Sequence, residues 1–380
     1  MTTDNNYQVI ETVKDLHYYL VQAMKLEHAT IPPYITALYS LKPGTNLEAF
    51  HIIRAVAVEE MLHLTLVANV FNAVGGKFFN EVEGKIEPTL TADDFIPHYP
   101  TALPTGETDF EVSLSKFSPE TVDTFIKIER TEESAPKDQP LVVSRPLKEN
   151  LLRVRGEDKS LTFYSIGLFY AEIIRGLYAL HKEMGDKLFC GDPKRQITPE
   201  YYYNGGGDII PVTDLRSAIR ALKVIQEQGE GSRSEAIYDA ERELSHYYRF
   251  QQLIPPLLNG KEQPPRYYIV NKDDPEKSDL PGSPTGECFT VDWDAVYPLK
   301  TNATLSDYPK GSEVYVAAKD FQSSYHKFLK EIEESFDGHP EKLIPAVGGM
   351  FRLKEQASHL IRNPIPGMNG VNAAPIFRLD

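Results

Sequence analysis

Apolar residues recur at helical spacing in several long stretches of the chain, and this repeat predicts a mainly α-helical protein. The predicted helices cover residues 9–40, 47–74, 161–184, 214–228, 232–254, 312–336 and 345–361. Four of them carry ionisable side chains inside the apolar stripe, at positions where a globular helix normally buries hydrocarbon. The pattern therefore predicts a four-helix bundle with polar side chains in its core.

The first two bundle helices show this interruption most clearly. Glu27 falls on the helix face that Leu20 and Ile31 share, and Glu60 and His63 fall in the apolar series of the second helix. Gly75 and Gly76 follow the second helix and are typical of a helix end. Three ligand-type side chains thus occupy core positions on two neighbouring helices.

A pair of prolines follows Glu27 closely. Pro32 and Pro33 lack the backbone donors that the carbonyl groups of His28 and Ala29 would receive in an uninterrupted helix. The sequence therefore predicts that the first helix kinks or breaks close to Glu27.

The other two bundle helices repeat the pattern. Glu172 interrupts the stripe of helix 161–184, and Glu243 and His246 interrupt that of helix 232–254. Ser232 and Glu235 have the spacing of a capping box, which predicts the start of this last helix. Between the two, Thr213 is the expected N-cap of helix 214–228.

The segments between the helices divide the chain. Residues 77–157 are rich in Pro, Gly, Asp and Thr, which indicates a long crossover with small strands such as Phe110–Leu114. We expect a bundle over residues 8–255 that includes this crossover. Residues 256–380 are expected to form an extended arm and two helices that pack on the bundle.

Composition narrows the classes of function. The 380 residues are 41% hydrophobic and 25% charged, and the formal net charge is −15. An acidic chain without a dense Lys/Arg run is not expected to bind nucleic acid or an anionic membrane. No segment has the pattern of an export signal or a transmembrane helix, so a cytoplasmic location is expected. Two cysteines do not form a Cys-x-x-Cys pair, so a metal must rely on Glu, Asp and His.

The ionisable residues in the stripes have the spacing of a two-metal site. Residues i and i+3 of a helix lie about 60° apart around its axis, so Glu60 and His63 can reach the same ion, as can Glu243 and His246. Single glutamates from the other two helices complete the pattern of a carboxylate-bridged pair of metals. The predicted metal ligands are Glu27, Glu60, His63, Glu172, Glu243 and His246. Oxygen and imidazole ligands favour two iron ions, with manganese as the alternative.

Several neighbouring residues admit a second interpretation. Glu59 also lies within reach of the face of His63, although the motif favours Glu60, and Asp239 lies one turn before Glu243. His28 points away from Glu27, which favours a role in packing or in supporting a ligand rather than metal binding. Tyr164 and Tyr170 are candidates for lining a pocket. The Gly-Glu-Gly sequence at 229–231 lacks the other features of a phosphate-binding loop and is interpreted as a turn between helices.

Local sequences then show a specific resemblance. Leu26–Tyr34 contains Thr-Ile-Pro-Pro-Tyr, Gln228–Ser232 reads Gln-Gly-Glu-Gly-Ser, and Glu243–Phe250 reads Glu-Leu-Ser-His-Tyr-Tyr-Arg-Phe. Together with Glu59–His63 and Ser165–Tyr170, these segments resemble the ferritin-like domain family associated with iminophenyl-pyruvate dimer synthase. The resemblance extends over roughly residues 10–255 and a similar helical tail. It implies a ferritin-like bundle with the six predicted side chains as ligands of two metal ions.

The leading functional hypothesis is a di-iron oxidoreductase of specialised metabolism. It would use dioxygen or peroxide on a small substrate derived from an aromatic amino acid. Two other classes remain open, namely an iron-binding or oxidant-scavenging protein and a non-catalytic protein that metal ions stabilise. The sequence leaves open the substrate, an electron-transfer partner and assembly into a homo-oligomer.

Overall fold

The computed structural model describes residues 10–82, 85–88, 97–101, 111–131, 134, 142–144, 161–163, 165–231 and 236–378. Its α-helices are α1 (Val13–Ser40), α2 (Leu47–Ala73), α3 (Pro119–Ile128), α5 (Ile166–Met184), α6 (Leu215–Glu230), α7 (His246–Gln251), α8 (Glu313–Phe336) and α9 (Leu343–Ile361). Two antiparallel hairpins accompany them, β1 (Phe79–Val82) with β2 (Lys85–Pro88) and β3 (Val142–Ser144) with β4 (Leu161–Phe163). The prediction of a mainly helical protein is confirmed.

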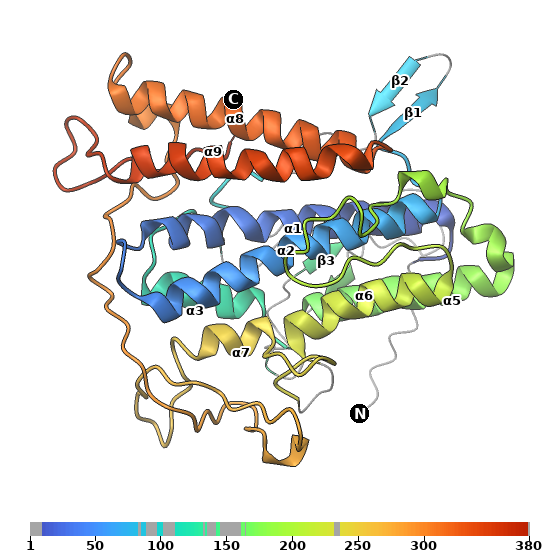
Figure 1. Ribbon diagram of the computed structural model, residues 1–380, viewed down its shortest axis with the longest axis horizontal. Helices are drawn as coiled ribbons and strands as arrows, with labels where there is room; N and C mark the ends of the chain where they lie inside the picture. Colours follow the sequence, from blue (N-terminus) through green and yellow to red (C-terminus); the bar gives the residue numbers. More distant parts are fainter. Residues whose placement is uncertain are drawn as a thin grey trace.

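The two longest helices, α1 and α2, pair along their length and form the centre of the molecule (Figure 1). On one side they are covered by two pairs of shorter helices, α5 with α6 toward one end and α3 with α7 toward the other. On the opposite side lies the hairpin of α8 and α9, which contacts α1 and α2. The bundle is therefore completed by helices that meet near the middle of α1 and α2.

Buried side chains divide between two main clusters. The larger one lies between α1, α2, α3, α5, α6 and α7 and includes Phe71, Phe169 and Phe250. The second joins α8 and α9 to the end of the chain through residues such as Phe321 and Phe377. Within the described part of the chain, no helix combines the length and apolar character needed to cross a bilayer.

The first helix does not break at its prolines. α1 runs unbroken through Pro32 and Pro33 to Ser40. The Tyr99 hydroxyl donates a hydrogen bond of 2.7 Å to the Ala29 carbonyl, one of the two groups that the prolines leave without a helical donor. A side chain from another segment thus compensates the lost backbone bond, and the predicted break is wrong.

The last predicted bundle helix is wrong over much of its length. Among the described residues of this segment only α7, six residues long, is helical, and residues 236–245 form turns and an isolated bridge. The Asp239 side chain accepts the backbone N–H groups of Glu241 and Glu243, and Arg242 adopts a positive φ of 65°. These local bonds compete with a helix. The predicted capping box at residues 232–235 lies outside the described residues.

The ends of α6, α8 and α9 agree closely with the prediction, whereas α5 begins later than predicted. Ser165 caps α5, and the residues predicted to begin this helix form β4 instead. The N-cap of α6 is Asp214, so the prediction of Thr213 is wrong. Ser312 caps α8. About half of the predicted crossover at 77–157, including Phe110, lies outside the described residues. Within it, Val112 makes an isolated bridge to Thr101, and α3 is a helix that the sequence pattern did not reveal.

Candidate metal centre

Two compact groups of ligand-type side chains lie in the bundle core. One contains Glu27, Glu60 and His63, and the other contains Glu60, Glu129 and His246. In each group, one nitrogen or oxygen of every residue lies within 4.8 Å of the others, and all five residues are buried. Because Glu60 belongs to both groups, the arrangement has the form of a pair of adjacent metal positions that share one carboxylate.

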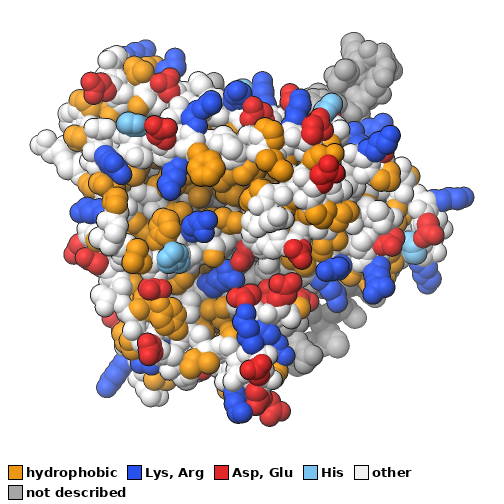
Figure 2. All heavy atoms as spheres, in the orientation of Figure 1, with side chains coloured by type: hydrophobic (Ala, Val, Ile, Leu, Met, Phe, Trp, Pro, Cys, Tyr) orange, Lys and Arg blue, Asp and Glu red, His pale blue; other side chains and the backbone are white. Residues whose placement is uncertain are grey.

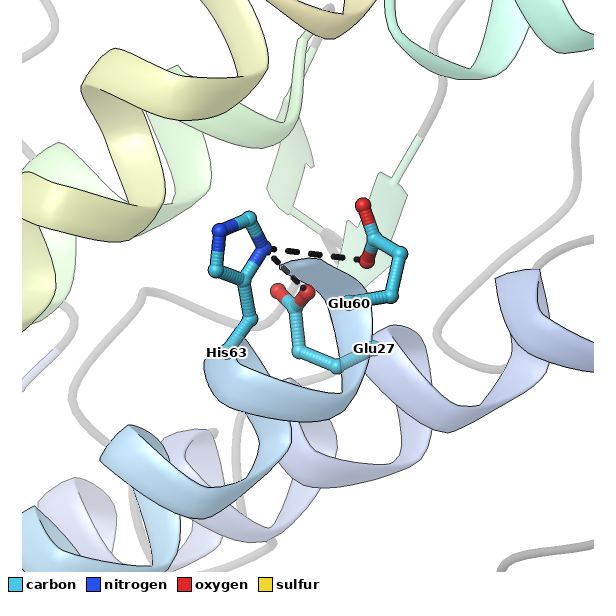
Figure 3. A group of neighbouring side chains, drawn as sticks. All are labelled: Glu27, Glu60 and His63. Carbon is cyan, nitrogen blue, oxygen red and sulfur yellow. Dashed lines mark ion pairs between the residues drawn. The ribbon is translucent and has the colours of Figure 1, made fainter. Parts of the chain in front are cut away.

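The geometry around Glu60 supports a bridging role. Its Oε1 lies 2.9 Å from His246 Nδ1, and its Oε2 lies 3.7 Å from His63 Nδ1. Glu27 Oε2 lies 3.3 Å from the same His63 nitrogen, as Figure 3 shows. On the other side, Glu129 Oε2 lies 3.4 Å from His246 Nδ1. Each oxygen of Glu60 therefore faces a different imidazole.

Both histidines present the same nitrogen to the carboxylates. His63 and His246 turn Nδ1 inward, and their rings stack with centroids 5.4 Å apart. Outside the group, His63 Nε2 lies 2.8 Å from Gln228 Oε1, and His246 Nε2 lies 2.7 Å from Glu59 Oε2. An oxygen acceptor at Nε2 keeps a proton on that nitrogen and leaves Nδ1 available as a ligand atom, as in metal-binding histidines.

The two outer carboxylates are each held by a buried tyrosine. The Tyr170 hydroxyl donates to Glu27 Oε1, and the Tyr34 hydroxyl donates to Glu129 Oε1 at 2.5 Å. In both cases the second carboxylate oxygen faces an imidazole. The tyrosines therefore fix which oxygen of each outer glutamate points toward the centre.

Without a metal, protons compensate the buried negative charge. Burial raises the pKa of Glu27 to about 8 and also raises the pKa of Glu129, and in both cases the charge of Glu60 adds to the rise. Burial by itself lowers the pKa of His63. The interactions with Glu27 and Glu60 outweigh the effect of burial, and the pKa of His63 rises to about 10. The pKa of His246 rises for the same reason, with Glu129 as the largest favourable partner. Burial opposes ionisation of Glu60 too, but the neighbouring imidazoles of His246 and His63 hold its pKa well below the ordinary value.

The residues present fit a pair of divalent cations. His246 Nδ1 is buried and has no well-directed hydrogen-bond partner within the described structure, although two carboxylate oxygens lie close to it. A buried polar atom in this situation requires an explanation, and a cation between these atoms supplies one. Three carboxylates and two imidazoles form a mixed oxygen and nitrogen donor set that suits iron or manganese.

Two of the six predicted ligands lie elsewhere. Glu172 forms an ion pair with Arg175 on its own helix, with 2.7 Å between Oε2 and Nε, and accepts the Ile10 N–H at 3.2 Å. Glu243 lies in the turn before α7, where it is more than half exposed and forms an ion pair with Lys272. The structure brings together Glu27, Glu60, His63 and His246, and it does not bring Glu172 or Glu243 to them.

Glu129 is the group member that the sequence analysis missed. It follows directly after α3 and caps that helix, in a segment that was interpreted as an irregular crossover. A signal was present, because Ser118 and Pro119 are typical of a helix start and Val122, Phe125 and Glu129 have helical spacing. The short length of α3 hid this pattern.

The remaining candidates have supporting or unrelated roles. Glu59 lies outside both groups but holds His246, and its own charge is paired with Arg249 at 2.8 Å. His28 Nε2 lies 2.8 Å from the Tyr325 hydroxyl, in agreement with its predicted packing role. Asp239 shapes the turn before α7. Tyr164 lies outside the described residues.

A small cavity and a larger cleft adjoin the group. The cavity, of about 10 Å³, is lined by four group members and by residues of α5 and α6, and can hold about one water-sized occupant. The cleft, of about 420 Å³, follows α6 past Arg216, Arg220 and Lys223 and reaches Gln228. Figure 2 shows acidic and basic side chains interspersed on the face of the molecule in this view. Because Gln228 lines the cleft and also contacts His63 Nε2, it connects the cleft with the metal groups.

Replacing Gln228 by leucine is expected to weaken metal binding about 10- to 100-fold, because His63 loses the acceptor that orients it. Equilibrium dialysis against Mn²⁺ measures this change. The substitution Lys223→Leu is the matched control, because it changes the same helix and cleft without touching the group. Equal Mn²⁺ affinity of Gln228→Leu and the unaltered protein would show that His63 needs no such support.

Comparisons with known proteins agree with the helical fold described above. A family model described as Ferritin-like matches residues 20–255. The crystal structure of a ferritin-like protein from Caulobacter vibrioides superposes with a TM-score of 0.60 at 22% identity, covering 96% of this chain and 98% of the other. That likeness shows the fold.

A curated relative is an enzyme. Dichlorochromopyrrolate synthase of Lentzea aerocolonigenes is 25% identical over 350 residues, which cover 86% of this chain. The same match covers 29% of the synthase, so the chain spans less than a third of the relative's length. The family match, the helical bundle and the buried carboxylate–histidine groups together show that this chain belongs to the ferritin-like family.

Proposed function

We propose that the protein is a di-iron oxidoreductase that acts on a small substrate derived from an aromatic amino acid, with dioxygen or peroxide as the oxidant. The observation that carries the proposal is the shared carboxylate of Glu60 between two inward-facing Nδ1 atoms. Manganese is the alternative metal. Two bound iron ions would supply the one-electron redox steps that oxidation by dioxygen requires.

The side chains around the group perform the remaining tasks. Glu27, Glu60 and His63 would hold one ion, and Glu60, Glu129 and His246 the other. Tyr34 and Tyr170 keep the outer carboxylates in place through their hydroxyl groups. Because all these residues are buried, the surrounding core keeps bulk water away from the reacting centre.

The cleft along α6 is the place that we assign to the substrate. Its volume of about 420 Å³ lies within the range of small-molecule sites. Arg220 and Lys223 supply positive charge, and Glu227 and Asp239 supply negative charge. These groups suit a molecule that retains the carboxylate and amine of an amino acid. The relationship to dichlorochromopyrrolate synthase supports an enzyme of secondary metabolism.

Anaerobic loading with ferrous iron, followed by oxygen and candidate aromatic amino-acid-derived substrates, tests this function. We expect two iron ions per chain, and oxygen consumption that rises when a substrate is present. Mass spectrometry of the products would show the oxidised substrate. Arg220→Ala is expected to raise KM about 10- to 100-fold with little change in kcat, because a charge-assisted hydrogen bond contributes about 1.5–3 kcal/mol.

Other outcomes would favour the other classes. Uptake of many iron ions per chain would indicate storage. Two tightly bound ions without oxygen consumption would indicate a purely structural role of the metal. Either result would overturn the oxidoreductase proposal.

A further inference from the structure

Four helix ends meet at the metal groups. α3 ends just before Glu129 and α7 begins at His246, and between them the start of α5 and the end of α6 line the adjoining cavity. Figure 1 shows α3 and α7 toward one end of the central pair and α5 and α6 toward the other. The cavity therefore lies where one pair of short helices gives way to the next.

Glu230, the last residue of α6, lines this cavity together with Glu27, Glu60, His63 and Glu129. Its Oε1 accepts the Gly167 N–H at 2.7 Å, at the start of α5. A Cβ atom at position 167 would lie 2.6 Å from the Glu230 carboxyl carbon, so the carboxylate occupies the space that a side chain there would fill. Gly167 thus allows Glu230 to reach the cavity wall.

The position of Glu230 is unfavourable for α6 itself. A negative side chain at a helix C-terminus opposes the helix dipole, and glycine within the last turn lowers helix propensity. Gly229 nevertheless lies beside the centre, because a Cβ atom there would be 3.9 Å from Glu129 Oε2. Gly231 then ends the helix with a φ of 105°. The Gly-Glu-Gly sequence therefore places one carboxylate against the metal groups without bulky neighbours.

With two divalent cations bound, the two groups would carry one positive charge in excess, which one more carboxylate would neutralise. Glu27, Glu60 and Glu129 supply three negative charges when ionised, whereas two divalent cations supply four positive charges. Excess charge is costly in a buried site. Glu172 and Glu243, either of which alone would have balanced it, are paired with Arg175 and Lys272 instead.

We propose that Glu230 is a fourth carboxylate ligand of the metal-loaded centre. This inference rests on the proposed two-metal function. In the structure Glu230 belongs to neither compact group, so binding requires its side chain to rotate from the Gly167 N–H toward a metal ion. The amide at the start of α5 is one of the groups that hold the carboxylate when metal is absent, and a metal ion would take the place of that amide when it binds.

Titration of the metal-free chain with Mn²⁺, followed by electron paramagnetic resonance of the unbound ion, tests the assignment. The protein as it stands should bind two ions. Glu230→Gln keeps an oxygen that can accept the Gly167 N–H but removes the charge, and it should weaken binding of one ion at least tenfold. Glu230→Asp, which keeps the charge on a shorter side chain, should bind that ion more tightly than Glu230→Gln does.

Glu227→Gln is the matched control, because it removes the same charge from the same helix and lines the outer cleft instead of the cavity. It should retain two ions at nearly unchanged affinity. If Glu230→Gln binds both ions as the unaltered chain does, Glu230 only caps α5 and the inference is wrong. Failure of the unaltered chain to bind metal would instead overturn the proposed function itself.

Discussion

Replacing Glu60 by alanine is expected to abolish tight binding of both metal ions, with a loss of affinity of at least about 100-fold for each. The reason is its position, because Glu60 is the one residue that belongs to both groups of described ligand-type side chains. The substitution also removes the carboxylate that faces both His63 and His246. Inductively coupled plasma mass spectrometry of protein reconstituted with iron and then desalted gives the metal content directly.

The controls for this substitution are changes at two glutamates that the sequence pattern predicted to be metal ligands. Glu172→Gln and Glu243→Gln change residues that the helical spacing predicted to be ligands but that the structure pairs with Arg175 and Lys272. Both variants should retain the iron content of the unaltered protein. Loss of one ion on either substitution, with full retention in Glu60→Ala, would reverse the ligand assignment.

The metal-free protein is expected to lose stability steadily as the pH rises from about 4.5 to 10. Folding raises the pKa of Glu27 from 4.5 to about 8, so the stability that its bound proton provides is complete below pH 4.5 and is lost by pH 8. Folding raises the pKa of His63 from 6.5 to about 10, so its contribution is lost over that interval. Each such group changes the free energy of unfolding by about 1.4 kcal/mol per pH unit.

The metal-loaded protein should behave differently, because bound cations have already displaced these protons. Thermal unfolding followed by circular dichroism at pH 7 and pH 9 compares the two forms. The melting temperature of the metal-free form should fall by several degrees between these values, and that of the loaded form should change much less. A flat profile for the metal-free form would contradict the account of shared protons at the centre.

The sequence pattern was sufficient to predict a helix and its candidate ligands where the helix is long and the ligands lie on one of its faces. The bounds of α2 and the end of α1 were predicted to within one residue, and these two helices carry Glu27, Glu60 and His63. The i, i+3 spacing places Glu60 and His63 together whatever the rest of the chain does. The helical character was therefore predictable from the pattern, and the resemblance of local sequences indicated the ferritin-like family.

The pattern failed where the chain builds the bundle from short pieces. Helical periodicity continues through residues 236–245, but the Asp239 side chain binds backbone N–H groups there and the chain turns. Glu243 consequently lies outside the bundle although His246, three residues later, lies inside. Glu129 was missed because a ten-residue helix gives a weak periodic signal.

Glu172 shows a different limit. It occupies the predicted helix, yet Arg175 one turn later neutralises it. Spacing alone does not distinguish a carboxylate that faces a metal from one that faces a neighbouring cation. Only the packing of α5 against the N-terminal segment, where Ile10 donates its N–H to Glu172, decides between them.

The central claim is that Glu60 lies between two metal ions, with Glu27 and His63 on one side and Glu129 and His246 on the other. Crystals grown with Mn²⁺ and measured at a wavelength of strong manganese anomalous scattering test it most directly. We expect two anomalous peaks, one on each side of the Glu60 carboxylate. The absence of peaks in the bundle core, or peaks beside Glu172 or Glu243 instead, would contradict the account.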